Sequence, residues 1–487
     1  MGRLADVDAT DDAQPQNFDL VVIGGGPGGY AAALYGASAG LDVGLVEFDK
    51  IGGTCLHRGC IPAKELLETA AIVRTVKHAG DFGVIVEPKS VEWATTLARK
   101  QAVIDKLAGG VTSLLKNRKV TMFNGVGTLG ADRTVHIRGV DGESATVTGD
   151  AVVLASGSVP RVIPGFEPDG HTVVTSDEFF HIGHIPRRAV VIGGGAIGCE
   201  FASTLADLGA SVTILEALPK VLPGCDDDVT RSVLQSFKKK GIEVRTGVAV
   251  KGHSGAGTGE GGIGTVVDFG EGETIETDLV VVSVGRVPFT DGLLAEGTAV
   301  TVGERGHIEV DEMCRTGEPS VWAVGDAIAT PQLAHVAFAE AILVVKDLLG
   351  ERPAAIDYSR VPWAIYCNPE VAFAGHSEAS AKEAGFDVLV SKHRFAGNSR
   401  AMILGETDGL VKIIAEKQAD GTGGRVLGVH MVGPWVTEQL SGGYLAVNWD
   451  CLLYTSPGRP RRPPGCPGCR RVRTPGRCRR TRRRCRR

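Results

Sequence analysis

Two segments of the sequence repeat one pattern: an apolar run, a glycine-rich turn, an alanine-rich stretch, and a second apolar run that ends in glutamate. The segments span residues 18–47 and 189–216. Short, β-branched apolar runs that alternate with helical stretches are typical of buried parallel strands joined by helices. The pattern therefore predicts an α/β protein with two separate parallel sheets.

The glycine spacing within these turns is that of a dinucleotide fingerprint. The glycines are Gly24, Gly26 and Gly29 in the first turn and Gly193, Gly195 and Gly198 in the second. The first glycine permits the tight turn, the second lets the backbone approach a pyrophosphate, and the third lets helix and strand pack closely. Glu47 and Glu216 each stand 18 positions after the third glycine, where a carboxylate accepts hydrogen bonds from a ribose. Two such units in one chain predict two adenine-dinucleotide sites.

Glu216 also bears on the choice of nucleotide. A carboxylate at this position repels a ribose 2′-phosphate, and the following residues 217–219 (ALP) contain no arginine that would bind one. The second site is therefore expected to prefer NAD over NADP.

The run 52–64 (GGTCLHRGCIPAK) places Cys55 and Cys60 before a helix that is predicted from residue 64 to about residue 76. The start of a helix favours thiolate over thiol, and one helical turn can bring two sulfurs within bonding range. The spacing suits a disulfide that forms and breaks during turnover. A pair of metal ligands and two inert buried cysteines are the alternatives that the spacing alone leaves open.

The chemistry of nicotinamide, thiols and flavins indicates which dinucleotide each of the two sites binds. Nicotinamide exchanges hydride, a thiol pair exchanges electrons through attack on sulfur, and a flavin can do both. Cys55 follows Glu47 by only eight residues. The first site is therefore predicted to bind FAD next to the disulfide, and the second to bind NAD.

Composition sets the outer limits. A length of 487 residues favours about three domains. The sequence contains no run of 18 apolar residues, so no membrane-spanning helix is predicted. Residues 1–16 are acidic and have the features of neither a signal nor a transit peptide, so we expect a flexible leader. Residues 1–450 contain only six cysteines, which is ordinary intracellular usage, and no metal site is predicted. Four of the six, Cys199, Cys225, Cys314 and Cys367, are expected to be small buried residues.

Taken together, the run 52–64, both fingerprints and the segment 321–326 (VWAVGD) resemble the pyridine nucleotide–disulfide oxidoreductases over about residues 18–450. Residues 285–288 (GRVP) and 333–335 (LAH), together with Glu216, make the sequence most similar to members that oxidise dihydrolipoyl groups with NAD. The resemblance implies two Rossmann-like FAD- and NAD-binding domains plus an α+β C-terminal dimerisation domain. Another disulfide reductase, or a flavoprotein with only NADH–acceptor (diaphorase) activity, is the alternative.

The same resemblance implies a domain order and partners. Residues 17–158 would bind FAD, 159–286 would bind NAD, 287–355 would complete the flavin-side core, and 356–450 would form a truncated interface domain. A cytoplasmic homodimer is expected, without membrane or nucleic acid. It would serve the lipoyl domains of 2-oxoacid dehydrogenase complexes or of the glycine cleavage system.

Residue roles also follow from the resemblance. Cys55 would attack substrate, Cys60 would be the thiolate against the flavin, and Lys64 would lie near flavin N5, paired with Glu200. The remaining FAD residues would be Gly24, Gly26, Gly29, Glu47, Thr54, Gly127, Ser156, Gly157, Ser158, Asp326 and Ala334, with Lys64 also contributing. The NAD residues would be Gly193, Gly195, Gly198, Glu216, Val248 and Gly285.

The family pattern stops near residue 450. Members carry, close to the C-terminus, a histidine that acts as acid and base and a glutamate that follows it and orients it. The last histidine here is His430, which we interpret as a packed strand residue. Residues 451–487 contain 14 arginines, five cysteines and no acidic residue, which leaves 1–450 with 38 basic and 57 acidic residues. A nucleic-acid arm, a metal site and out-of-frame sequence are the three interpretations, and we favour the last, with a disordered tail.

Overall fold

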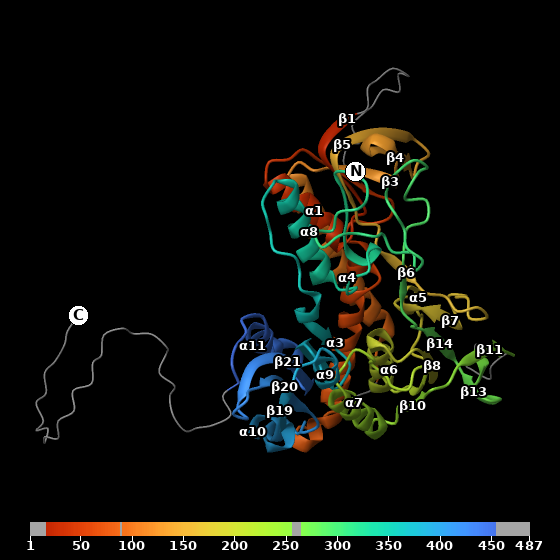
Figure 1. The fold of residues 1–487 in the computed structure, drawn as a ribbon. Coiled ribbons are helices and arrows are strands. Elements are labelled where there is room, and N and C mark those ends of the chain that lie inside the picture. The colour runs from red at the N-terminus through yellow and green to blue at the C-terminus, as the bar shows by residue number, and fades with distance from the viewer. Residues whose placement is uncertain (1–15, 88–89, 256–263, 454–487) are drawn as a thin grey trace, which may run out of the picture.

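The computed structural model of the chain describes residues 16–87, 90–255 and 264–453. The predicted leader, apart from residue 16, and the tail from residue 454 onward lie outside the described residues. Figure 1 shows three groups of elements: one around α1 and α8 at the top, one around α6 and α7 at the lower right, and one around β19–β21 at the lower left. The helices α3 (Cys60–His78) and α4 (Trp93–Asn117) run between them.

The first sheet has six strands and combines distant parts of the chain. Its strands are β1 (Gln16–Ile23), β2 (Val43–Glu47), β3 (Thr121–Leu129), β4 (Thr134–Gly139), β5 (Ser144–Leu154) and β16 (Val321–Ala323). β1 pairs in parallel with β2 and β5, and β16 joins the free edge of β5 in parallel. Helices α1 (Pro27–Ser38) and α8 (Ala334–Leu348) pack against one another beside this sheet. The apolar core of this unit therefore includes both β1 and β16.

The second sheet is wholly parallel, with the order β10-β9-β8-β14-β7. Its strands are β7 (Val173–Thr175), β8 (Arg188–Ile192), β9 (Ser211–Glu216), β10 (Glu243–Thr246) and β14 (Leu279–Val282). Helices α6 (Ala196–Asp207) and α7 (Asp227–Lys239) connect its strands. The apolar runs at 18–23, 43–47, 189–192 and 211–216 are thus strands, as the sequence pattern predicts.

A small antiparallel sheet extends from the second one. It contains β11 (Val250–Ser254), β12 (Thr265–Phe269) and β13 (Glu273–Thr277). β11 pairs antiparallel with β12, and residues 256–263 between them lie outside the described residues. The two-stranded β6 (Ser158–Pro160) and β15 (Arg286–Pro288) connect the two large units.

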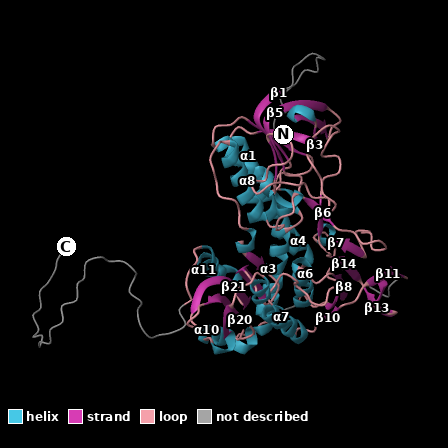
Figure 2. Ribbon diagram, in the orientation of Figure 1, coloured by secondary structure: helices cyan, strands magenta, loops and turns pink. Residues whose placement is uncertain are grey.

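The third sheet is antiparallel and has the order β17-β18-β21-β20-β19. Its strands are β17 (Trp363–Ile365), β18 (Glu370–Gly375), β19 (Val388–Arg394), β20 (Leu410–Lys417) and β21 (Gly423–Gly433). The helices α9 (Glu378–Glu383), α10 (Ser399–Leu404) and α11 (Val436–Asn448) belong to this unit, which Figure 2 shows as strands and helices together. The remaining short helices are α2 (Gly53–His57), α5 (Ser176–Phe179), η1 (Ala79–Phe82), η2 (Ala131–Arg133), η4 (Gly325–Ala327), η5 (Tyr358–Arg360) and η6 (Phe395–Gly397).

Two boundaries differ from those predicted. Helix α3 begins at Cys60 rather than at Lys64, because Pro62 falls in the first turn, where no backbone N–H is needed. The prediction of a disordered tail from residue 451 is wrong for residues 451–453. Val426 N donates to Cys451 O, and Leu453 N donates to Gly424 O, so these residues add to the edge of β21.

The buried residues match several expectations. Cys199, Cys225, Cys314 and Cys367 are all buried. His430 is 1% exposed in β21, its Nε2 lies 2.9 Å from His376 O, and its ring stacks on that of Phe373. His430 is therefore a packed strand residue, as expected from its apolar surroundings.

Candidate active site

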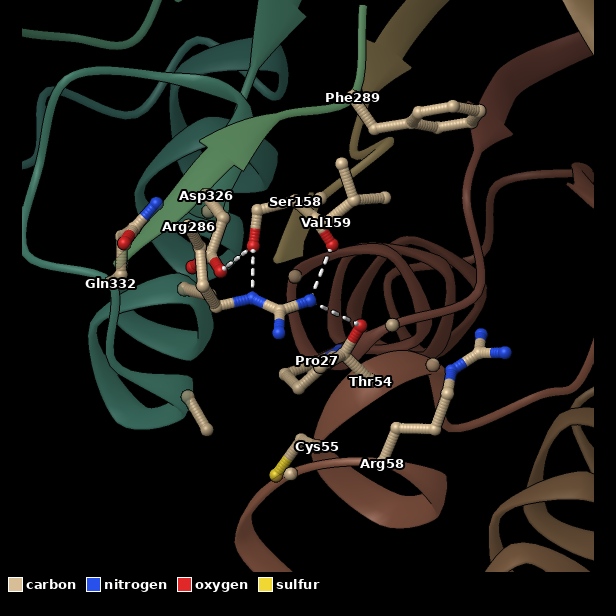
Figure 3. A pocket seen from close by; sticks show the side chains of 18 of the residues that line it. Pro27, Thr54, Cys55, Arg58, Ser158, Val159, Arg286, Phe289, Asp326 and Gln332 are labelled. Atoms are coloured by element: carbon tan, nitrogen blue, oxygen red, sulfur yellow. Dashed lines mark hydrogen bonds between the residues drawn. The ribbon is translucent and has the colours of Figure 1, made fainter. Parts of the chain in front are cut away.

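A cavity of about 1060 Å³ lies where the two large units meet. Its lining comes from the first glycine turn, α2, the start of α3, residues 155–159, the turn 324–326 and the start of α8. The second unit contributes the start of α6 and residues 283–286. In Figure 3, Cys55, Thr54, Ser158, Asp326 and Arg286 are seen at this cavity.

The first glycine turn has no space for side chains at two of its three fingerprint positions. A Cβ on Gly24 would lie 2.2 Å from Ala155 O, and one on Gly29 would lie 1.7 Å from Gly24 O. Gly26 caps α1 and would meet only Gly53 Cα, at 4.0 Å, so its backbone is open to a ligand. The helix N-terminus at this position offers unpaired N–H groups to an anion such as a pyrophosphate.

Glu47 closes the same turn. Its Oε2 accepts a hydrogen bond from Gly25 N at 2.6 Å, and its Oε1 accepts one from Asp49 N at 2.8 Å. Glu47 lines the cavity next to Phe48, whose ring lies 5.9 Å from that of Phe289. The carboxylate is thus held by backbone at the position where the fingerprint places a ribose.

Cys55 and Cys60 face each other across the break between α2 and α3. Both are free thiols that line the cavity, and a hydrogen bond between the two side chains is the largest influence on the pKa of each. That hydrogen bond lowers the pKa of Cys60 to about 7, with a further contribution from the Lys64 ammonium, although burial opposes the shift. The same hydrogen bond and burial raise the pKa of Cys55. Cys60 is therefore the sulfur that this site stabilises as a thiolate.

Lys64 and Glu200 form an ion pair at the floor of the cavity. Lys64 Nζ lies 3.0 Å from both Glu200 Oε1 and Oε2. Tyr366 N donates to Glu200 Oε1 at 2.8 Å, and the Lys64 ammonium lies 4.9 Å from the centre of the Tyr366 ring. Burial works against the ammonium, but Glu200 outweighs it and raises the pKa of Lys64. The pair connects α3 to α6, and Tyr366, the residue that follows β17, is bonded to it.

Ser158 bonds directly to Asp326 and also to Arg286, an arginine that sequence reasoning missed. Ser158 Oγ donates to Asp326 Oδ2 at 2.6 Å and accepts from Arg286 Nε at 2.8 Å, as Figure 3 shows. Arg286 also donates to Ser158 O at 2.6 Å and to Thr54 Oγ1 at 3.5 Å. Arg286 belongs to the GRVP run at residues 285–288, and no local sequence pattern predicts its bonds to Ser158 and Thr54.

The part of the cavity that the first glycine turn lines fits a flavin dinucleotide. Ser156 Oγ is buried and has no hydrogen-bond partner within the described part of the chain, so it is available to a ligand. Gly157 has a φ of +74°, and a Cβ on Gly127 would press on Ile23 and Val46 at 3.1 Å. Ala334 is the first residue of α8 and lines the cavity. A dinucleotide with a polar ring system needs exposed backbone N–H groups for its pyrophosphate and a side-chain hydrogen-bonding group for its ring. The glycine turn with its helix start supplies the first, and the Ser156 hydroxyl supplies the second.

The second glycine turn repeats the geometry of the first. Gly193 has a φ of +104°, and a Cβ there would lie 2.5 Å from Ser283 O, while one on Gly198 would lie 2.0 Å from Gly193 O. Gly195 is the N-cap of α6, and a Cβ built on it would have no atom within 4 Å. Glu216 accepts from Gly194 N at 2.5 Å and from Leu218 N at 2.7 Å.

The predicted NAD residues do not all lie in one place. Gly195 and Gly285 line the large cavity, whereas Gly193, Gly198, Glu216 and Val248 lie outside its lining. Val248 N donates to Glu216 O at 3.1 Å, so Val248 supports the strand end that carries the carboxylate. The predicted FAD residues all line the cavity except Gly29, which packs beneath Gly24.

One further residue near the dithiol was missed. Burial, followed by the proximity of Cys55 and Cys60, raises the pKa of Tyr30 to about 12. Tyr30 stands directly after the third glycine of the first fingerprint, and that position was the only sequence signal for it.

No helix among the described residues is both long enough and apolar enough to cross a membrane.

Comparison with known proteins agrees with this geometry. The family described as "Pyridine nucleotide-disulphide oxidoreductase" matches residues 18–341, and its dimerisation domain matches residues 361–454. A dihydrolipoyl dehydrogenase of Bacillus subtilis is 39% identical over 437 residues, which cover 88% of this chain and 91% of that protein. The dihydrolipoyl dehydrogenase of Geobacillus stearothermophilus is 37% identical over 431 residues, which cover 88% and 89%.

A solved structure shows the same architecture. The crystal structure of LpdA from Mycobacterium tuberculosis superposes with a TM-score of 0.81 at 25% identity, covering 89% of this chain and 94% of that one. The family match covers well over half of the chain and includes both glycine turns and the cysteine pair. The chain therefore belongs to the pyridine nucleotide–disulphide oxidoreductase family.

Proposed function

We propose that this protein oxidises dihydrolipoyl groups and transfers their electrons to NAD. The observation that carries the proposal is the Cys55–Cys60 dithiol at the wall of a cavity that residues from both dinucleotide turns help to line. The relatives named dihydrolipoyl dehydrogenase, at 36–39% identity over most of the chain, support this substrate class.

The thiol chemistry starts from the oxidised Cys55–Cys60 disulfide. A substrate thiolate attacks Cys55 Sγ, the Cys55–Cys60 bond breaks, and its electron pair remains on Cys60 as the thiolate. The second substrate thiolate then attacks the substrate sulfur that is bonded to Cys55. The cyclic lipoyl disulfide leaves, Cys55 keeps one of the two substrate protons, and the other proton passes to a base.

The surroundings of the two cysteines suit Cys60 to be the leaving thiolate and Cys55 to be the sulfur that substrate attacks. Cys60 is suited to be the leaving thiolate because its pKa is lowered to about 7 by the Cys55 hydrogen bond and by Lys64. Cys55, whose pKa is raised, retains its proton after the substrate departs. Glu200 keeps Lys64 charged and fixes it on the Cys60 side.

The geometry of the two turns supports FAD at the first turn and NAD at the second. FAD, when bound, supplies a two-electron acceptor that can react with both a thiol pair and a nicotinamide. The residues that would hold it are Gly24, Gly26, Gly29, Glu47, Thr54, Lys64, Gly127, Ser156, Gly157, Ser158, Asp326 and Ala334. NAD would lie against Gly193, Gly195, Gly198, Glu216, Val248 and Gly285.

A second activity is favoured by one observation. The family's C-terminal histidine and glutamate have no counterpart in this sequence, where no histidine follows His430. A general base contributes typically ~10²–10⁴-fold to a proton-transfer step. NADH oxidation by an artificial acceptor needs no such base at the thiols, so diaphorase activity is the second candidate function.

The proposal includes a homodimer, which the match of residues 361–454 to a dimerisation domain supports. It also includes lipoyl domains of 2-oxoacid dehydrogenase complexes, or of the glycine cleavage system, as the physiological thiol partners in the cytoplasm.

The test measures NAD reduction by dihydrolipoamide with the FAD-loaded protein, beside NADH oxidation by ferricyanide. Cys55→Ser and Cys60→Ser are expected to abolish the first reaction, while Cys451→Ser, at an exposed cysteine outside the cavity, is the matched control. A folded protein that binds no FAD, or one in which Cys55→Ser leaves the dihydrolipoamide reaction unchanged, would contradict the proposal.

A further inference from the structure

Glu340 is a fully buried carboxylate behind the cavity wall. It lies in α8, its residue exposure is 0%, and it is not among the residues that line the cavity. Glu340 Oε2 accepts a hydrogen bond from Gly325 N at 2.6 Å, and Oε1 accepts one from Tyr358 OH at 3.0 Å. Neither donor is a cation, so this carboxylate is held by neutral groups.

Gly325 is a demanding position for the backbone. Its φ of +69° lies in the left-handed region, and it begins the short helix η4 that carries Asp326. Asp326 points toward Ser158 and Arg286 at the cavity (Figure 3). The N–H of Gly325 therefore sits one residue before the carboxylate that faces the cavity, and Glu340 determines where that N–H points.

Tyr358 brings in a different part of the chain. It lies in η5, which leads into the antiparallel sheet. The next residues of η5 contact the last helix of the described chain: Asn448 Nδ2 donates to Arg360 O at 3.3 Å, and Arg360 pairs with Asp450 at 3.4 Å. Glu340 thus joins a segment packed on α11 to the turn at the cavity.

Burying the Glu340 carboxylate costs free energy unless Gly325 N–H and Tyr358 O–H both donate to it. Removing a carboxylate from water is unfavourable, and burial raises the pKa of Glu340 while the hydrogen bond from Gly325 opposes that shift. If the acceptor is removed, the buried Gly325 N–H loses its partner, which costs more than a typical hydrogen bond contributes. The turn would then reorient to satisfy that N–H elsewhere, and Asp326 would move with it.

We propose that Glu340 is a positioning residue of the flavin site, which fixes the turn carrying Asp326 and ties it to Tyr358. The inference rests on the proposed function, because the group that Asp326 would contact is FAD. Glu340 acts through Gly325 and Asp326, and the residue itself touches neither cofactor nor substrate.

The test compares FAD binding by apoproteins that carry matched substitutions on one helix. Glu340→Leu removes both acceptor oxygens, and the dissociation constant of FAD is expected to rise about tenfold or more. Glu340→Gln keeps one oxygen for Gly325 N and is expected to restore most of the affinity. Tyr358→Phe removes only the hydroxyl and is expected to weaken FAD binding several-fold.

Asp347→Leu is the control. Asp347 is also in α8 with a 6% exposed side chain, and it accepts from Trp322 Nε1 at 3.0 Å and pairs with Arg315, but it does not contact Gly325. Its substitution is expected to lower the thermal unfolding midpoint and to leave FAD affinity within about twofold, since it lies away from the turn.

The outcomes separate this inference from the proposed function. Wild-type protein that folds without binding FAD contradicts the proposed function. If wild type binds FAD and Glu340→Leu binds it equally well, the positioning role is overturned and Glu340 only supports the fold. If Glu340→Leu does not fold, Tyr358→Phe decides, and an unchanged FAD affinity in that variant overturns the proposal.

Discussion

Lys64 Nζ lies 3.0 Å from both carboxylate oxygens of Glu200, although the two residues are 136 positions apart in the chain. This bidentate contact connects the helix that starts at Cys60 with the helix that starts at the second glycine turn. The dithiol and the predicted NAD turn are therefore held in one rigid arrangement. Because Lys64 also lowers the pKa of Cys60, the ion pair contributes to the electrostatics of the sulfur as well as to its position.

The two cysteines are expected to differ in spectroscopy. Two-electron reduction of FAD-loaded protein should produce a long-wavelength band from a thiolate next to the flavin. Cys60→Ser should abolish the band, because Cys60 is the sulfur stabilised as thiolate, and Cys55→Ser should keep it. A band that survives in Cys60→Ser would reverse the two roles, and Cys451→Ser serves as the unchanged reference.

The ionisation of Cys60 should depend on Lys64. The folded-state pKa of Cys60 is about 7, so the thiolate is present above that pH and is lost as the pH falls through it. In Lys64→Met the ammonium is removed, and the midpoint should move to higher pH. The rate of alkylation of reduced protein by iodoacetamide, followed against pH, measures the midpoint. Lys77→Met, on the same helix but bonded to Asp207 O, is the control.

Nucleotide choice should depend on Glu216. Because both of its oxygens are held by backbone N–H groups at 2.5 and 2.7 Å, the carboxylate is fixed where a 2′-phosphate would have to bind. Wild-type protein should reduce bound flavin much faster with NADH than with NADPH. Glu216→Gln removes the charge and keeps an acceptor, so the preference for NADH should fall by about tenfold. Equal rates with both nucleotides in wild-type protein would place the ribose elsewhere.

Lys412 should be important for stability. Its side chain is 3% exposed, and its Nζ lies 2.9 Å from Asp226, 2.8 Å from Asp228 and 2.8 Å from Glu378. Replacing it by Met leaves the buried Asp226 carboxylate without its cation, whereas Asp228 keeps Lys392 and Glu378 keeps Lys382. Because one buried carboxylate is left unpaired, we expect a loss of about 3–5 kcal/mol in the free energy of unfolding. Urea unfolding of Lys412→Met and of Lys417→Met, an exposed lysine on the same strand, measures the difference.

The same cluster predicts how stability changes with pH. The pKa of Glu378 is lowered to about 2, mainly by hydrogen bonds from Lys382 and Lys412. The pKa of Asp226 is also lowered, because its hydrogen bond to Lys412 outweighs burial. Depressed carboxyl pKa values stabilise the fold above about pH 4 and lose that contribution as the pH falls toward 2. The wild-type advantage over Lys412→Met should therefore shrink over this range, and an unchanged difference at pH 3 would contradict the assignment.

Much of the local structure could be predicted from sequence. The strands at 43–47 and 211–216 begin and end as predicted, because short β-branched runs between glycines and a helix admit few alternatives. The glycine turns carry their own geometry, since Gly24 and Gly193 need positive φ and have carbonyl oxygens where a side chain would be. The start of α3 was less clear, because Pro62 interrupts the helical pattern in a turn where proline is tolerated.

The sequence by itself determined the two glycine turns, their carboxylates and the cysteine pair, because the residues of each of these features are close together in the chain. Only the tertiary structure decided that Arg286 reaches Ser158 and Thr54, that Glu340 is bonded to Gly325 and Tyr358, and that Lys412 lies among three carboxylates. These contacts join segments that are far apart in sequence, and a lone arginine, glutamate or lysine has no local pattern. Its partner is chosen when the sheets pack and buried charges and N–H groups must be satisfied.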